Sequence, residues 1–154
     1  MDLKNRKIGV IGAGIAEGEI YELAYQVGYL LGSEGAIVYT GGLGGIMEAA
    51  SKGAVEAGGI TVGILPGHKY TDANPYVKIP VLTDMGHARN VILVRSVEAV
   101  VAISGGYGTL SEIALALKMW KPVIGIKTWE NIPEVIYVNT PKEVIIKLKE
   151  LFQD

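Results

Sequence analysis

The residues best placed to do chemistry are Ser-Gly-Gly-Tyr-Gly-Thr-Leu-Ser-Glu at 104–112. An apolar run at 98–103 predicts a short buried strand before them, and the pattern at 111–120 predicts a helix after them. Glycines at such a turn let the backbone approach a ligand closely, and the free amides at a helix start favour an anion. The sequence therefore predicts a phosphate-binding turn made of Gly105, Gly106, Tyr107, Gly108 and Thr109.

Glu112 has two interpretations. It follows the turn by one helical turn, where a carboxylate lies close enough to act on whatever carries the phosphate. Thr109 and Glu112 also have the spacing of a capping box, in which the two residues satisfy each other's backbone donors. Tyr107 is equally open, since its ring either stacks on a base or is a surface turn residue. The residues alone leave these alternatives open.

A second glycine cluster favours a ligand. Gly41, Gly42, Gly44 and Gly45 follow an apolar run at 36–40 and lead into a predicted helix. Two clusters at strand ends in one small domain favour a shared phosphate-sized ligand. A third turn, Gly12-Ala13-Gly14, is a weak match to a dinucleotide-binding motif, because its third glycine is displaced and the second strand ends without an acidic residue. No turn ends in the Gly-Lys-Ser/Thr of a nucleotide-triphosphate loop.

Strand, glycine turn and helix alternate along the chain. The predicted strands are continuously apolar, which is typical of strands buried on both faces. The sequence thus predicts an α/β fold, a single doubly wound, mostly parallel Rossmann-like sheet with helices on both faces, over one domain at 1–154. Ligands of such sheets bind at the carboxyl ends of the strands, where all three glycine turns fall. Strands are expected at 7–12, 36–40, 60–65, 98–103, 122–126 and 134–138, with at most a short one at 77–79, and helices at 19–32, 46–57, 87–96 and 111–120 and after Thr140.

Composition argues against several kinds of binding partner. The net charge of −2 argues against nucleic acid as a main partner, and no apolar run is long enough to span a bilayer. The chain has no cysteine and its polar N-terminus gives no sign of a signal peptide, which fits a cytoplasmic protein. His68 and His87 are too isolated for a metal site, and no metal or cofactor is predicted.

Self-association is expected. Hydrophobic residues make up 49% of the chain and charged residues only 19%. The helix predicted at 111–120 is apolar nearly all round, which is typical of a buried helix. These features predict a homodimer or higher homo-oligomer formed in part by the helices at 87–96 and 111–120.

Taken together, the two glycine clusters resemble those of the LOG-like proteins, often labelled lysine decarboxylases, of the SLOG and DprA-type Rossmann group. The motif of that family is Pro-Gly-Gly-x-Gly-Thr-x-x-Glu, which residues 104–112 match except at the first position. A family glycine cluster leading into Leu-Met resembles Gly41–Met47, and Gly59–Pro66 also matches. The resemblance covers residues 8 to about 126.

The resemblance implies a nucleotide-binding protein. Characterised LOG enzymes are phosphoribohydrolases, which cleave the N-glycosidic bond of nucleoside 5′-monophosphates to a free base and ribose 5-phosphate. Their catalytic pair corresponds to Arg89 and Glu112 here. Met85 belongs to the segment that carries the arginine, and Arg95 either reaches the same phosphate or pairs with Glu98. The alternative is a non-catalytic binder of a nucleotide or phosphate-bearing cofactor, since the same fold serves an algal molybdenum-cofactor carrier.

The chain departs from the LOG pattern at several positions. Ser104 replaces the proline of the motif, Asn90 replaces a lysine, and Glu48 follows Met47 where glycine is common. One extra residue separates Met85 from Arg89. These departures, together with the short chain, favour a compact bacterial and archaeal branch rather than the plant-type enzymes.

Overall fold

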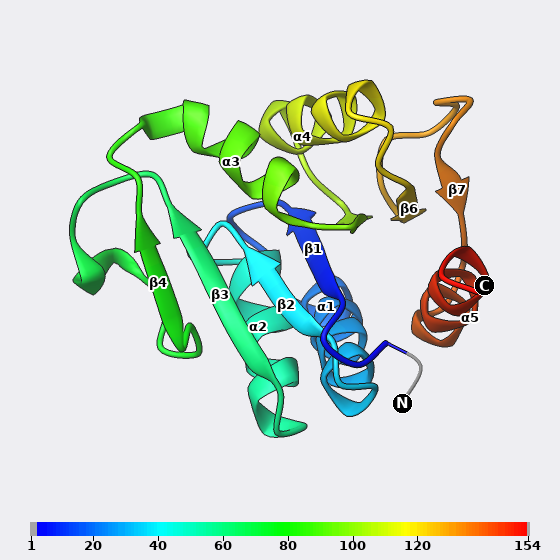
Figure 1. The fold of residues 1–154 in the computed structure, drawn as a ribbon, viewed down its shortest axis with the longest axis horizontal. Helices are drawn as coiled ribbons and strands as arrows, with labels where there is room; N and C mark the ends of the chain where they lie inside the picture. The colour runs from blue at the N-terminus through cyan, green and yellow to red at the C-terminus, as the bar shows by residue number, and fades with distance from the viewer. Residues whose placement is uncertain (1–2, 154) are drawn as a thin grey trace.

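The computed structural model describes residues 3–153. Strands and helices alternate along most of the chain (Figure 1). The strands are β1 Lys7–Gly12, β2 Ile37–Thr40, β3 Ile60–Leu65, β4 Ile79–Leu82, β5 Ala99–Ile103, β6 Val123–Ile126 and β7 Ile136–Tyr137. The α-helices are α1 Gly18–Ser33, α2 Ile46–Glu56, α3 Arg89–Ser96, α4 Tyr107–Lys118 and α5 Pro141–Leu151, with short 3₁₀ turns η1 at Tyr70–Asp72 and η2 at Gly86–Ala88.

The strands form one sheet in the order β4-β3-β2-β1-β5-β6-β7, and every neighbouring pair is parallel. The predicted doubly wound α/β sheet is confirmed. The chain builds outward from β1 to β4 on one side, then returns to place β5 on the other side of β1. This reversal between β1 and β5 is the topological switch point, where open α/β sheets bind their ligands.

Helices cover both faces of the sheet. One apolar cluster joins the sheet to α1, α2 and α5, and a second joins it to α3 and α4. In Figure 1, α3 and α4 lie above the strands, α1 and α5 lie below them, and α2 is drawn behind β2 and β3. All five residues of β5 are buried, as its continuously apolar sequence predicts. Glycines let α1 and α2 touch closely, since a Cβ on Gly28 would lie 2.0 Å from the carbonyl oxygen of Ala50.

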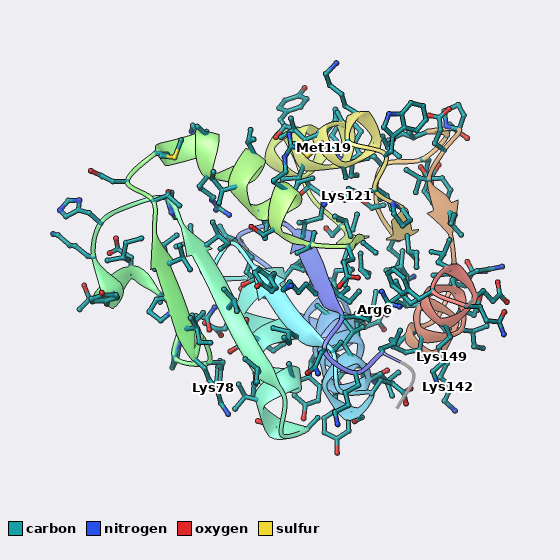
Figure 2. The ribbon with its side chains drawn as sticks, viewed as in Figure 1. Arg6, Lys78, Met119, Lys121, Lys142 and Lys149 are labelled. Carbon is teal, nitrogen blue, oxygen red and sulfur yellow. The ribbon has the colours of Figure 1, made fainter. Side chains whose placement is uncertain are left out.

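A lysine beyond the end of α4 holds the end of α3 in place. Lys121, labelled in Figure 2, donates from Nζ to the carbonyl oxygens of Arg95 at 3.1 Å and Val97 at 2.5 Å. Carbonyls in the last turn of a helix lack intrahelical partners, and a cation there also favours the helix dipole. The contact fixes the carboxyl end of α3 close to the start of β6.

The largest differences from the sequence prediction are in β4 and α4, while β7 is also shorter than the strand predicted at 134–138 and α3 starts at Arg89 rather than at residue 87. The strand expected at 77–79 instead runs Ile79–Leu82 and forms the edge of the sheet beside β3. The helix expected from Ser111 begins at Tyr107, so most of the predicted phosphate-binding turn belongs to the first turn of α4. None of the helices formed by residues 3–153 is long and apolar enough to cross a membrane.

Candidate functional site

A pocket of about 200 Å³ lies at the carboxyl ends of the central strands, beside the switch point. Its walls come from the turns after β1, β2 and β5 and from the start of α3. The lining residues are Ile11, Gly12, Ala13, Gly14, Gly41, Met47, His87, Arg89, Asn90, Gly106, Gly108, Thr109 and Glu112.

The amino end of α4 forms one wall. Gly106 is the N-cap residue, and the first helical hydrogen bond runs from the amide of Leu110 to the carbonyl of Gly106 at 3.1 Å. The amides of Tyr107, Gly108 and Thr109 precede that bond and have no partner within the helix. Together with the helix dipole, they make this wall attractive to an anion.

The structure decides against the capping box. Thr109 is the third residue of α4 rather than its N-cap, and no side chain caps this helix end. Glu112 lies in the second turn, too far along the helix to bond the amide of the N-cap residue. Helix capping therefore does not explain why Glu112 is buried.

Arg89 also lines the pocket. It is the first residue of α3, and its half-buried guanidinium occupies the space above Gly41, where a Cβ would lie only 1.8 Å from Nη1. Burial lowers the pKa of Arg89, and the neighbouring carboxyl of Glu112 acts in the opposite direction. Within residues 3–153 the guanidinium makes no hydrogen bond and no direct ion pair. It is therefore a cation with unused donors facing a pocket.

Glu112 lines the same pocket and is only 7% exposed. Burial raises the pKa of Glu112 to about 7, and the positive charge of Arg89 limits the rise. In the described part of the chain, its carboxyl makes no hydrogen bond and no ion pair at direct contact distance. The pocket thus combines an anion-attracting wall with a carboxyl that exchanges its proton near neutral pH.

Some of the residues singled out in the sequence line this pocket and others do not. Gly41, Arg89, Gly106, Gly108, Thr109 and Glu112 line it. The residues outside its lining are Gly42, Gly44, Gly45, Met85, Arg95, Gly105 and Tyr107.

Glycines of the second cluster outside the pocket shape the loop that carries Gly41. Gly45 has φ +63° and its Cβ would lie 2.3 Å from the carbonyl oxygen of Ala13. Gly42 has φ +79° and its Cβ would lie 2.6 Å from Leu65. The loop after β2 therefore packs directly on the turn after β1.

Arg95 and Tyr107 point elsewhere. Arg95 is exposed in the last turn of α3, and the Glu98 carboxylate instead accepts bonds from Arg6 Nη1 and the Lys7 amide, both at 2.9 Å. Tyr107 is 83% exposed and its ring stacks on Trp129 with centroids 6.0 Å apart. Met85 is half exposed just before the 3₁₀ turn that leads into α3.

The turn after β1 was not among the candidate site residues predicted from the sequence. Gly12, Ala13 and Gly14 line the pocket although they fail as a dinucleotide motif. A Cβ on Gly12 would lie 2.2 Å from the carbonyl of Ile103, so β1 and β5 meet tightly beneath the site. The position of this turn could have indicated its role, because a glycine turn at the end of a central strand faces the switch point whatever its motif. His87 and Asn90 also line the pocket, one on each side of Arg89.

The chain is similar in sequence to one protein over almost its full length and to another over half of it. An uncharacterised protein from Archaeoglobus fulgidus is 48% identical over 143 residues, which is 93% of this chain and 94% of that protein. The Arabidopsis thaliana cytokinin riboside 5′-monophosphate phosphoribohydrolase LOG5 is 36% identical over 80 residues, 50% of this chain and 35% of that enzyme.

Solved structures of two molybdenum-cofactor proteins match almost the whole chain. The molybdenum cofactor binding protein of Rippkaea orientalis superposes with a TM-score of 0.91 at 36% identity, covering 98% of this chain and 99% of that one. The molybdenum cofactor carrier protein of Chlamydomonas reinhardtii gives 0.90 at 33% identity, covering 98% and 100%. The model of the SLOG cluster4 family matches residues 5–151, and the chain belongs to that family.

Proposed function

We propose that this protein binds a small phosphate-bearing ligand, a nucleotide or a molybdenum cofactor, in the pocket beside the switch point. The carrying observation is the guanidinium of Arg89, which lies over Gly41, makes no hydrogen bond among residues 3–153 and lines the same pocket as the amino end of α4. The phosphate lies on the amides of Tyr107, Gly108 and Thr109, and Arg89 neutralises its charge. The full-length similarity to molybdenum-cofactor proteins supports binding without requiring catalysis.

Calorimetric titration tests this proposal. We expect at least one nucleoside 5′-monophosphate, or the molybdenum cofactor, to bind, and adenosine without its phosphate not to bind. Arg89→Ala should weaken binding by about 10- to 100-fold, the usual effect of losing a charge-assisted hydrogen bond. Arg95→Ala removes the same charge from the exposed end of the same helix and should stay within about twofold of the wild type. Equal losses in the two variants would show a general charge effect and contradict a phosphate site at Arg89.

A second candidate function, cleavage of the N-glycosidic bond of a nucleoside 5′-monophosphate, is favoured by the buried carboxyl of Glu112. A carboxylate beneath the ribose stabilises an oxocarbenium-like transition state or helps a water attack it. Glu112→Gln should keep ligand binding and lose about 100-fold or more in cleavage rate, because an amide supplies no negative charge. Chromatography of the released base measures this. The absence of base release by the wild type from every monophosphate would leave the binding function alone.

We further propose that the protein is a homodimer or higher homo-oligomer that uses α3 and α4. Val91 on α3 is 40% exposed and Trp120, just beyond α4, is 94% exposed. Uncovered apolar side chains on neighbouring helices favour a partner. Light scattering at micromolar concentration should give at least twice the mass of the chain, and Val91→Glu should shift the protein toward monomer. A monomeric mass for the wild type would refute this proposal.

A further inference from the structure

We propose that Thr128 and Trp129, in the loop after β6, are positioning residues that hold the phosphate-binding turn in its ligand-ready conformation. The proposal rests on the proposed function, because the turn they hold is the one assigned to the phosphate. Neither residue lines the pocket, and neither belongs to a motif found in the sequence.

The loop after β6 forms hydrogen bonds with several backbone groups of the turn. The amide of Ser104 donates to the carbonyl of Lys127 at 3.0 Å. The hydroxyl of Thr128 donates to the carbonyl of Ser104 at 2.7 Å, and the indole Nε1 of Trp129 donates to the carbonyl of Gly106 at 3.0 Å. Segments more than twenty residues apart are thereby joined along the outer side of the turn.

Holding these carbonyls sets the direction of the amides. In a planar trans peptide the carbonyl and the following N–H point in opposite directions. The carbonyl of Gly106 accepts from the amide of Leu110 within α4 and also from Trp129, so the amide of Tyr107 points away from both donors. The carbonyl of Ser104 likewise points to Thr128, so the amide of Gly105 points away from the loop.

The turn needs such support. Gly105 has φ +115° and Ser104 has φ +55°, and no side chain caps the amino end of α4. Adjacent glycines lose much conformational freedom when ordered, so a free turn would sample many orientations of its amides. Ordering it before the ligand arrives removes that cost from binding.

Trp129 is itself held firmly. Its ring stacks on Tyr107 at an interplanar angle of 29°, and Tyr137 of β7 donates its hydroxyl proton to the carbonyl of Trp129. The edge strand of the sheet is therefore linked through Trp129 to the phosphate-binding turn.

Two conservative substitutions remove the hydrogen bonds. Trp129→Phe keeps an aromatic ring but has no N–H, and Thr128→Val keeps the side-chain shape but has no hydroxyl. With inorganic phosphate as the probe in calorimetry, each variant should raise Kd by about 3- to 10-fold. Thr71→Val is the matched control for Thr128→Val, since Thr71 is exposed in η1 and outside the pocket lining, and its Kd should not change.

Amide order parameters in the absence of any ligand give a second readout. We expect the order parameters of Gly105 and Tyr107 to fall in Trp129→Phe while those of β5 stay at wild-type values. Unchanged order parameters together with an unchanged Kd would overturn the positioning role, as would a fall spread evenly over the whole chain. If the wild type binds no inorganic phosphate, the order parameters alone decide whether the loop orders the turn, and the titrations with nucleoside 5′-monophosphates and the molybdenum cofactor decide the proposed function separately.

Discussion

Ser104→Pro is expected to lower the free energy of unfolding by at least about 3 kcal/mol, measured by urea denaturation. Ser104 has φ +55°, whereas the proline ring fixes φ near −65°. The amide of Ser104 also donates to the carbonyl of Lys127 at 3.0 Å, and proline has no such donor. The substitution therefore imposes a backbone rotation and also removes a hydrogen bond from a partly buried turn.

Ser104→Gly is the matched control. Glycine adopts positive φ without strain, so its greater freedom in the unfolded chain is offset by relief of the left-handed conformation. We expect its unfolding free energy to lie within about 1 kcal/mol of the wild type. A Ser104→Pro protein as stable as the wild type would mean that the turn does not require its left-handed residue.

This position separates the chain from the LOG motif in physical terms. The motif has proline where this chain has Ser104, and a proline there holds φ near −65°. A turn that begins at φ +55° places the following glycines differently, so conclusions about phosphate geometry do not transfer unchanged from the motif. The substitution was visible in the sequence, but its consequence depends on a dihedral angle that the sequence does not reveal.

Local pattern was sufficient for most strands of the sheet but not for β4 or for the start of α4. The predicted bounds of β1 and β3 are confirmed, because continuous apolar runs ending at glycine or proline specify short buried strands. The helix begins four residues before the predicted Ser111, within Tyr-Gly-Thr, whose helix propensities are low. Trp129, distant in sequence, bonds the residue at the N-cap, and no local pattern reports such a contact.

The sequence predicted the site only in part, because some of its residues are brought together by contacts between distant segments. The resemblance drew attention to Arg89 and Glu112, and the structure places both in one pocket, while their catalytic roles stay a prediction. The role of Gly41 follows from Arg89, which fills the space that a side chain would occupy. The turn at Gly12 was expected at a strand end where ligands bind, but its weak motif kept it out of the candidate site residues, although its place at the switch point is what brings it into the site.

Wild-type protein should lose about 3 kcal/mol of stability relative to Glu112→Gln as the pH rises from 4.5 to above 7. Burial raises the pKa of Glu112 from 4.5 to about 7, so between these values the folded protein binds a proton that the unfolded chain has released. The stabilising contribution of the protonated carboxyl is complete below 4.5 and is lost as the pH rises through the folded pKa. Glutamine does not titrate and lacks this dependence.

Urea denaturation of both proteins at several pH values measures the difference. Other titrating groups are common to the two proteins and cancel in the comparison, provided their surroundings are unchanged. The charge of Arg89 limits the rise in the pKa of Glu112, so Arg89→Ala should raise the pKa of Glu112 in the folded protein further. The stability of the Arg89→Ala protein should therefore be lower at neutral pH. Parallel pH profiles for the wild type and Glu112→Gln would show that the carboxyl ionises as it does in water. That result would remove the physical basis for proton exchange near neutral pH in this pocket.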